Sequence, residues 1–391
     1  MNYFEFNNLV KICSGNNALA NIKHELDYFG ATNPLILSDE GLKAVGTLKT
    51  VTKILSKQNL NTKNIFTNIP TDSGTDTINN IAKFYLNNNC DSIIALGGGS
   101  VIDTAKGVRL MLSQNVDNIL SLSGNEIISR GKHIPFIVVP TTCGTGSECT
   151  YVAVIKDSKS HIKLEFISQA MLPDVAVLDS TVIETLPKKL IATTSIDALT
   201  HAIEAYSCAQ KNIISSSFAS ASISLIVKNL LLSLNNPAKA EYKLNLLNAS
   251  TLAGLAFSNS MVGIVHAIGH ALGSVGVPHG TAMAVLLSKC LKFNLDVCES
   301  DYAELLNHFM GAEYFANIAC ENRAKSFVEN VNTFVNNVSS VAGFSLHLAD
   351  YGVTENQLES IAAIALNDGA AIINPKLFNK NDVINILKQC M

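Results

Sequence analysis

The first half of the chain alternates short apolar runs with amphipathic stretches, and this alternation limits the possible folds more than any other feature. Runs short enough to be buried strands lie at 34–37, 64–67, 92–96, 134–139 and 175–178. Stretches with helical periodicity lie between them, at 40–56, 75–86 and 101–112. The pattern predicts a mostly parallel sheet with helices on both faces. Two further runs, 152–155 and 162–167, flank D-S-K-S and predict a hairpin.

The second half has a different texture. From Leu190 onward the sequence is rich in Ala, Ser and Leu, has a period near 3.6 residues and contains few β-branched runs. Helices are expected at 216–232, 242–257, 248–271 and 303–309. We therefore expect an α/β domain at 1–184 followed by an all-helical domain at 185–391.

A glycine turn stands between one buried strand and its helix. The residues are Gly97, Gly98, Gly99 and Ser100. Backbone N–H groups and a helix dipole at such a turn can hold a phosphate, although the pattern differs from G-x-G-x-x-G. Ser100 and Asp103 also form S-x-x-D, so the alternative is a capped helix after a tight turn. Three consecutive glycines exceed what capping needs and favour phosphate binding.

Polar residues also follow two neighbouring strands. P-T-T-C-G-T-G-S-E, residues 140–148, comes after one strand, and Asp39 comes after an earlier one. Ligands of open α/β sheets bind outside the carboxyl ends of the strands. A carboxylate there can accept a hydrogen bond from a ribose 2′-hydroxyl and repel a 2′-phosphate, which favours NAD over NADP. The alternative for Asp39 is an N-cap of the next helix.

Two pairs of ionisable residues at helical spacing predict a metal site in the second half. Asp197 and His201 are one turn apart, as are His266 and His270, and His279 follows in a P-H-G turn. One carboxylate with several imidazoles suits Fe²⁺ or Zn²⁺ better than Ca²⁺ or Mg²⁺. A single D-x-x-x-H would more simply be a hydrogen-bonded core pair, but two pairs in apolar sequence need a shared partner.

Composition excludes several classes of function. The net charge is −4 without a basic block, which argues against nucleic acid as a partner. We find no run of the length that a membrane span needs and no signal peptide, so we expect a cytoplasmic protein that binds no membrane. The nine cysteines include no C-x-x-C, which predicts reduced thiols. A catalytic thiol at Cys143 or Cys149 would lack a nearby base.

Taken together, five motifs resemble the iron-containing (group III) alcohol dehydrogenases of the dehydroquinate-synthase-like superfamily. They are G-G-G-S-V-I-D-T-A-K, P-T-T-C-G-T-G-S-E, L-P-D-V-A-V-L-D, D-A-L-T-H-A-I-E-A-Y, and H-A-I-G-H-A-L-G with P-H-G. The likeness runs from an N-terminal hairpin to Asn374-Pro375. It implies a dinucleotide-binding first domain and a metal-binding second domain. The implied activity is hydride transfer between NAD and a primary alcohol or its aldehyde at a divalent metal, Fe²⁺ or Zn²⁺.

The resemblance also implies roles for individual residues. The implied metal ligands, which are catalytic, are Asp197, His201, His266 and His279, and His270 would relay a proton. The implied cofactor contacts are Asp39, Gly97, Gly98, Gly99, Ser100, Asp103, Thr141, Thr142, Thr145, Val154, Lys163 and Leu186. For His270 the alternative is a core histidine that donates to a backbone carbonyl. We expect a homo-oligomer, a dimer or larger.

Three departures from the family pattern bear on these expectations. The loop from Ala271 to Pro278 is one residue short and lacks an aromatic residue, so we expect a wide substrate mouth that admits diols or hydroxy acids besides simple alcohols. The Thr71–Gly74 turn replaces a proline-rich one, which affects adenine contacts, and Ser180 replaces a proline. The alternatives are a lyase of the dehydroquinate synthase type, a glycerol or polyol dehydrogenase, and a non-catalytic nucleotide-binding protein.

Overall fold

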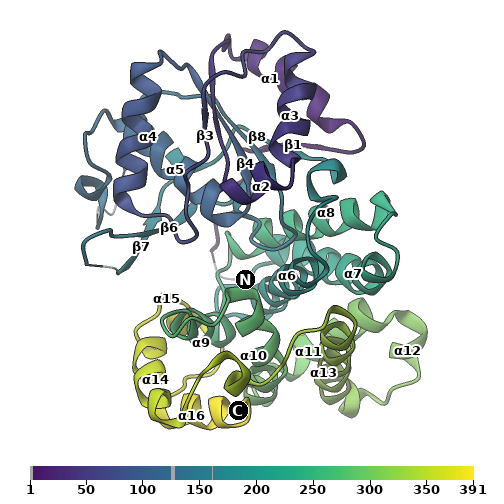
Figure 1. Cartoon of the computed structure of the whole chain (residues 1–391). Coiled ribbons are helices and arrows are strands. Elements are labelled where there is room, and N and C mark those ends of the chain that lie inside the picture. Colours follow the sequence, from purple (N-terminus) through teal and green to yellow (C-terminus); the bar gives the residue numbers. More distant parts are fainter. Residues whose placement is uncertain (1–2, 125–127, 161) are drawn as a thin grey trace. The chain divides into compact units, whose positions relative to one another are not determined.

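In the computed structural model, which describes residues 3–124, 128–160 and 162–391, the chain forms two compact units (Figure 1). One unit is Asn8–Leu186. The other is Pro187–Met391 together with the N-terminal segment that ends at Asn7. That segment, which we had assigned to the α/β domain, packs in the helical unit, where the Phe6 and Phe218 rings stack at 5.6 Å.

A six-stranded parallel sheet forms the centre of the first unit and confirms the predicted fold class. The strand order is β1-β8-β5-β4-β2-β3. The strands are β1 Lys11–Ser14, β2 Pro34–Leu37, β3 Ile65–Phe66, β4 Ser92–Gly97, β5 Phe136–Pro140 and β8 Val175–Leu178. The α-helices of this unit are α1 Ile22–Tyr28, α2 Glu40–Ala44, α3 Thr47–Ser56, α4 Thr75–Asn87 and α5 Gly99–Gln114. The predicted hairpin is also present, as antiparallel β6 Val152–Lys156 and β7 Lys163–Ile167.

Helices lie on both sides of this sheet, α4 and α5 on one side and α1 and α3 on the other (Figure 1). Alternate strand residues, among them Leu35, Ile93 and Phe136, form one core with Ile78 of α4 and Val101 of α5. Because side chains alternate across a strand, the intervening residues face the opposite side, and they are also buried. Burial on both faces explains why these strands read as unbroken apolar runs.

Two predictions about the first unit were wrong. We expected an N-terminal hairpin, but β1 is a single edge strand that pairs in parallel with β8. Its K-I-C-S sequence is largely exposed and carries no apolar signal. The helix expected at 40–56 is two helices, because Gly46 lies between them with φ of 87°, a left-handed conformation that favours glycine.

The second unit is helical. Its helices are α6 Lys188–Ser207, α7 Ile213–Asn235, α8 Ala240–Phe257, α9 Ile264–Gly273, α10 His279–Asn294, α11 Glu299–Met310, α12 Ala312–Ala316, α13 Arg323–Ala342, α14 Leu358–Leu366, α15 Gly369–Ile373 and α16 Lys380–Lys388. Helices α6, α7 and α8 pack on one another, and α9 and α10 pack together. We expected no segment long and apolar enough to cross a membrane, but α7 is such a segment by length and composition, which buried core helices also can be.

The prediction of one helix over 248–271 was also wrong. Helix α8 ends at Phe257 and the next helix, α9, begins at Ile264. Met261 lies in the break with φ of 77°. Gly263 precedes α9, and a Cβ there would lie 2.7 Å from Asn374 Oδ1. The break therefore depends on a residue that is distant in the sequence, which local periodicity cannot reveal.

A buried lysine of α5 forms hydrogen bonds that connect this helix to the hairpin within the first unit. Lys106 is fully buried and its Nζ donates at 2.8 Å to Ser147 Oγ, to Thr150 Oγ1 and to the carbonyl of Val152. Asp103, one turn earlier, accepts from Ser147 Oγ at 2.7 Å and from the Val154 N–H at 3.0 Å. Burial lowers the pKa of Lys106 to about 8, and the Asp103 charge partly offsets that effect.

We expect Lys106→Met to lower the free energy of unfolding by about 3 kcal/mol at neutral pH, because it leaves the Asp103 charge without its cation. The Lys106→Met/Asp103→Asn double variant should lose less than the sum of the two single variants. Urea unfolding followed by circular dichroism measures both quantities. An unchanged midpoint for Lys106→Met would contradict this account.

Candidate metal centre and nucleotide-binding turn

Three helices of the second unit bring the predicted metal ligands together. Helix α6 carries Asp197 and His201 one turn apart, α9 carries His266 and His270, and α10 begins at His279. The Oδ1 atom of Asp197 lies 3.2 Å from His279 Nε2, 3.6 Å from His266 Nε2 and 3.9 Å from His201 Nδ1. The helical spacing thus placed each pair on one face, as expected from the sequence.

The innermost three residues could share one cation. Asp197, His201 and His266 are buried, and each offers a ligand atom within 4.8 Å of the other two. Asp197 Oδ1, His201 Nδ1 and His266 Nε2 have no hydrogen-bond partner. Buried polar atoms without partners are costly, so three that face one another fit a shared cation. His279 is 41% exposed and lies on the open side of this cluster.

The protonation states of Asp197 and His201 suit a shared cation. Burial lowers the pKa of His201 to about 3, so its imidazole is neutral at pH 7 and has a free lone pair. Burial alone would raise the pKa of Asp197, but the surrounding imidazoles hold it well below its ordinary value. Burial opposes the charged form of His266 too, yet the neighbouring Asp197 and Glu204 carboxylates raise its pKa to about 9, so a cation that binds Nε2 would displace a proton from it.

His270 pairs with a carboxylate outside this cluster. Its Nδ1 lies 2.8 Å from Asp368 Oδ2, and its ring stacks on His279 with centroids 5.5 Å apart. The ring is 36% exposed, so a core histidine that donates to a backbone carbonyl does not describe it. Burial would raise the pKa of Asp368, but the hydrogen bond with His270 lowers it.

Sequence reasoning missed two carboxylates beside this cluster. Glu204 lies 2.5 Å from His266 Nδ1. It stands three residues after His201 in the same motif, and this spacing on a helix face could have indicated it. Asp368 offered no such signal, because it reaches His270 from a segment 98 residues away.

The glycine turn is tightly packed against the 140–146 loop. A Cβ on Gly98 would lie 3.0 Å from Thr142 Cγ2, and one on Gly99 would lie 3.0 Å from Thr145 Cγ2. The Thr141 N–H donates to the carbonyl of Gly97 at 3.0 Å. Helix α5 has Gly98 as its N-cap, without a side-chain capping bond. The alternative capping box of Ser100 and Asp103 therefore does not form, and the helix start offers backbone N–H groups to an anion.

The remaining predicted cofactor residues of this unit differ in whether their polar atoms are free to contact a nucleotide. Asp103 has both carboxylate oxygens engaged, by Ser147 and Val154. Exposed Lys163 pairs with Asp72 at 3.0 Å, and Ser100 Oγ accepts from the Asp72 N–H at 3.3 Å. The T-D-S-G turn thus contacts both the glycine turn and the hairpin.

Asp39 is the N-cap of α2, and its Oδ1 accepts from the Leu42 N–H at 2.8 Å. This is the role that we gave as the alternative. Asp39 follows Ser38 after the carboxyl end of β2, which is Leu37, and its side chain is half-buried. Leu186, the last residue of the first unit, is also half-buried, and its N–H donates to Ile183.

An α/β unit with a glycine turn and a helical unit with a buried Asp/His cluster are the parts of a nucleotide- and metal-dependent dehydrogenase. The family model "Iron-containing alcohol dehydrogenase" matches residues 10–180, and "Fe-containing alcohol dehydrogenase family, C-terminal" matches residues 191–391. The chain belongs to the iron-containing alcohol dehydrogenase family and is an oxidoreductase of alcohols and aldehydes. This confirms the resemblance and the enzyme class inferred from the sequence.

Individual relatives agree with the family model over the whole chain. Alcohol dehydrogenase 4 of Schizosaccharomyces pombe is 32% identical over 96% of this chain and 86% of its own length. The 1,3-propanediol dehydrogenase of Citrobacter freundii is 30% identical over 100% of both chains. A crystal structure of a 1,3-propanediol oxidoreductase superposes with a TM-score of 0.92 at 28% identity, again over 100% of both chains.

One glycine beside the cluster yields a direct test of its packing. A Cβ on Gly280 would lie 2.7 Å from the carbonyl oxygen of Thr193, on the helix that carries Asp197. We expect Gly280→Ala to push α10 away from α6 and to lower the free energy of unfolding by about 1–3 kcal/mol. The matched control is Gly273→Ala, whose Cβ would meet no atom within 4 Å. Thermal unfolding should show a lower Tm for Gly280→Ala alone; equal Tm values would contradict the packing argument.

Proposed function

We propose that the protein interconverts a primary alcohol and its aldehyde with NAD(H) at a divalent cation held by Asp197, His201, His266 and His279. The observation that carries the proposal is the set of three buried ligand atoms that face one another without hydrogen-bond partners. His279, 3.2 Å from Asp197 Oδ1, would complete the set from the exposed side.

The donor set supports Fe²⁺ and also accommodates Zn²⁺. One carboxylate oxygen and three imidazole nitrogens suit either ion, whereas Ca²⁺ and Mg²⁺ prefer oxygen shells. We propose Fe²⁺ because the chain belongs to the iron-containing family.

When bound, the cation would act as a Lewis acid on the substrate oxygen and the nicotinamide would exchange hydride with the carbinol carbon. The side chains of the protein would hold and move the proton. With Nδ1 donating to the Asp368 carboxylate 2.8 Å away, Nε2 of His270 would be the nitrogen that accepts a proton. Its partial exposure supports a relay between substrate and solvent.

We propose that the dinucleotide binds along the strand ends of the first unit. The first turn of α5, with Gly97, Gly98, Gly99 and Ser100, would hold the pyrophosphate. The other proposed contacts are Asp39, Asp103, Thr141, Thr142, Thr145, Val154, Lys163 and Leu186. Because both oxygens of Asp103 are engaged, its contribution would be to fix Ser147 and Val154 in place.

The substrate we propose is a primary alcohol with a polar or branched extension, such as a diol or hydroxy acid. The loop before His279, S-V-G-V-P, supplies only small and aliphatic side chains, which would leave space beside the cluster. Relatives of full length include 1,3-propanediol dehydrogenases, which supports the diol. A polyol dehydrogenase and a lyase of the dehydroquinate synthase type are the alternatives, and the lyase would form no net NADH.

Reduction of NAD⁺ with an alcohol panel tests the proposal. Chelated protein is reloaded with Fe²⁺ without oxygen, or with Zn²⁺, and assayed with ethanol, butanol and 1,3-propanediol. We expect NADH formation only in reloaded protein, and a loss of about 100- to 1,000-fold in kcat/KM for His266→Ala/His279→Ala, because several kcal/mol of charge stabilisation are lost.

His347→Ala, an exposed histidine of the same unit, is the control and should keep full activity. Full activity of the double variant after chelation would refute the metal centre. A steep preference for ethanol over the two larger alcohols would refute the wide substrate mouth.

Asp39 determines the expected preference for NAD(H) over NADP(H), because its charge would repel a 2′-phosphate. Asp39→Asn keeps a good N-cap for α2 and removes the charge, so stability should change little. We expect the ratio of kcat/KM for NAD⁺ to that for NADP⁺ to fall about ten- to a hundredfold, corresponding to about 1–3 kcal/mol. Preference of the parent enzyme for NADP⁺ would contradict this role.

The cytoplasmic location and the homo-oligomer stay predictions from the sequence, as does the domain boundary near residue 184.

A further inference from the structure

A buried carboxylate lies behind the proposed metal ligands and contacts one of them directly. Glu204 is on α6 and only 5% exposed. Its Oε2 lies 2.5 Å from His266 Nδ1, and its Oε1 accepts from the Val265 N–H at 2.7 Å. One side chain of α6 thus holds both the backbone and the imidazole of the first turn of α9.

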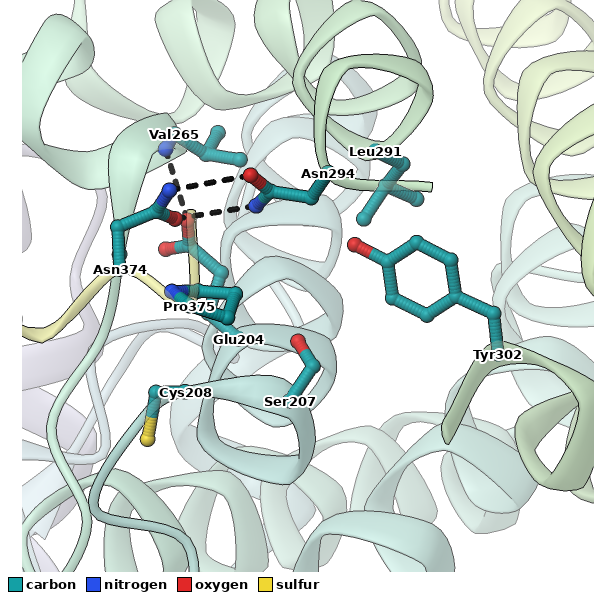
Figure 2. Close-up of a pocket in the computed structure, with 10 residues that line it drawn as sticks. Glu204, Ser207, Cys208, Val265, Leu291, Asn294, Tyr302, Asn374 and Pro375 are labelled. Atoms are coloured by element: carbon teal, nitrogen blue, oxygen red, sulfur yellow. Dashed lines mark hydrogen bonds between the residues drawn. The ribbon is translucent and has the colours of Figure 1, made fainter. Parts of the chain in front are cut away.

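Two asparagines complete this attachment. Asn374 Oδ1 accepts from the Ile264 N–H at 3.1 Å and from Asn294 Nδ2 at 3.0 Å. Asn374 Nδ2 donates back to Asn294 Oδ1 at 3.0 Å, and Figure 2 shows the two amides joined by both bonds. The first two N–H groups of α9 are therefore satisfied by side chains from two other segments, which fixes where this helix begins.

The close approach of these groups needs a glycine. A Cβ on Gly263 would lie 2.7 Å from Asn374 Oδ1 and 3.2 Å from Glu204 Oε1. Beyond Glu204 lies a pocket of about 10 Å³, which Tyr302 and Ser207 help to line (Figure 2). This volume has room for about one water molecule, so bulk solvent does not compete for the carboxylate.

We propose that Glu204 is a positioning residue for the metal centre, which holds the proton of His266 on Nδ1 and turns Nε2 toward Asp197. His266 Nε2 lies 3.6 Å from Asp197 Oδ1 and has no hydrogen-bond partner. A carboxylate behind a ligating imidazole fixes its tautomer and raises its basicity. The inference rests on the proposed function, because Glu204 would contact the metal-binding residue His266 and not the metal ion itself.

Glu204→Gln separates the two tasks of the side chain. The amide oxygen can still accept one hydrogen bond, but the amide N–H₂ cannot accept the second. We expect the metal-free variant to fold, and its affinity for Co²⁺, measured by competition with a chelator, to fall about 10- to 100-fold. The visible absorption spectrum of the Co²⁺-loaded protein should also change, because the imidazole reorients.

Asn374→Ala is the matched comparison, since it loosens the start of α9 without touching His266. It should lower the Tm of the metal-free protein and leave the Co²⁺ affinity within a few-fold of wild type. Equal losses of affinity in the two variants, each in proportion to lost stability, would overturn the positioning role. So would wild-type affinity and an unchanged spectrum in Glu204→Gln.

A measurement on the unaltered protein keeps the inference testable if Glu204→Gln does not fold. Histidine ring ¹⁵N spectra of Zn²⁺-loaded wild type should show His266 protonated at Nδ1; protonation at Nε2 would overturn the inference while leaving the metal centre intact. A wild type that binds neither Co²⁺ nor Zn²⁺ would refute the proposed function and this inference together.

Discussion

The burial of the Asp197 carboxylate is the constraint on which the helical unit depends. A charge taken out of water is costly unless other groups compensate it. Here the compensation comes from imidazoles on α6, α9 and α10, so these helices must converge on one point. Close approach then requires small residues where backbones meet, as Gly280 does against Thr193.

In the first unit the buried charges are compensated by neighbouring hydroxyl and backbone groups. Lys106 and Asp103 are satisfied by hydroxyl and backbone groups of the 147–154 segment. The glycine turn beside them presents backbone N–H groups and no side-chain cap. Rigid internal pairing next to an open helix start favours binding of an anion without rearrangement of the loops.

The sequence predicted those features that local patterns encode. Strands β2 and β8 begin and end where their apolar runs do, since central parallel strands are buried on both faces. Helical spacing and a turn indicated the Asp/His cluster, whereas the choice of Asp197, His201, His266 and His279 as ligands came from the resemblance to the family. Strand β1, the break before α9 and the carboxylate Asp368 were missed, because each depends on a partner distant in the chain. Local periodicity carries no information about such partners.

The attachment of α9 by Asn374 has a consequence for the order of events during biosynthesis. A ribosome completes Asp197, His201, His266 and His279 before it reaches Asn374. Until that asparagine arrives, the Ile264 N–H lacks its acceptor and α9 has no fixed starting point. Residues 8–186, which form the first unit, are made before this segment, whereas α9 gains the acceptor of its first N–H only with Asn374. The order of synthesis thus separates the proposed metal ligands from the residue that fixes the start of their helix.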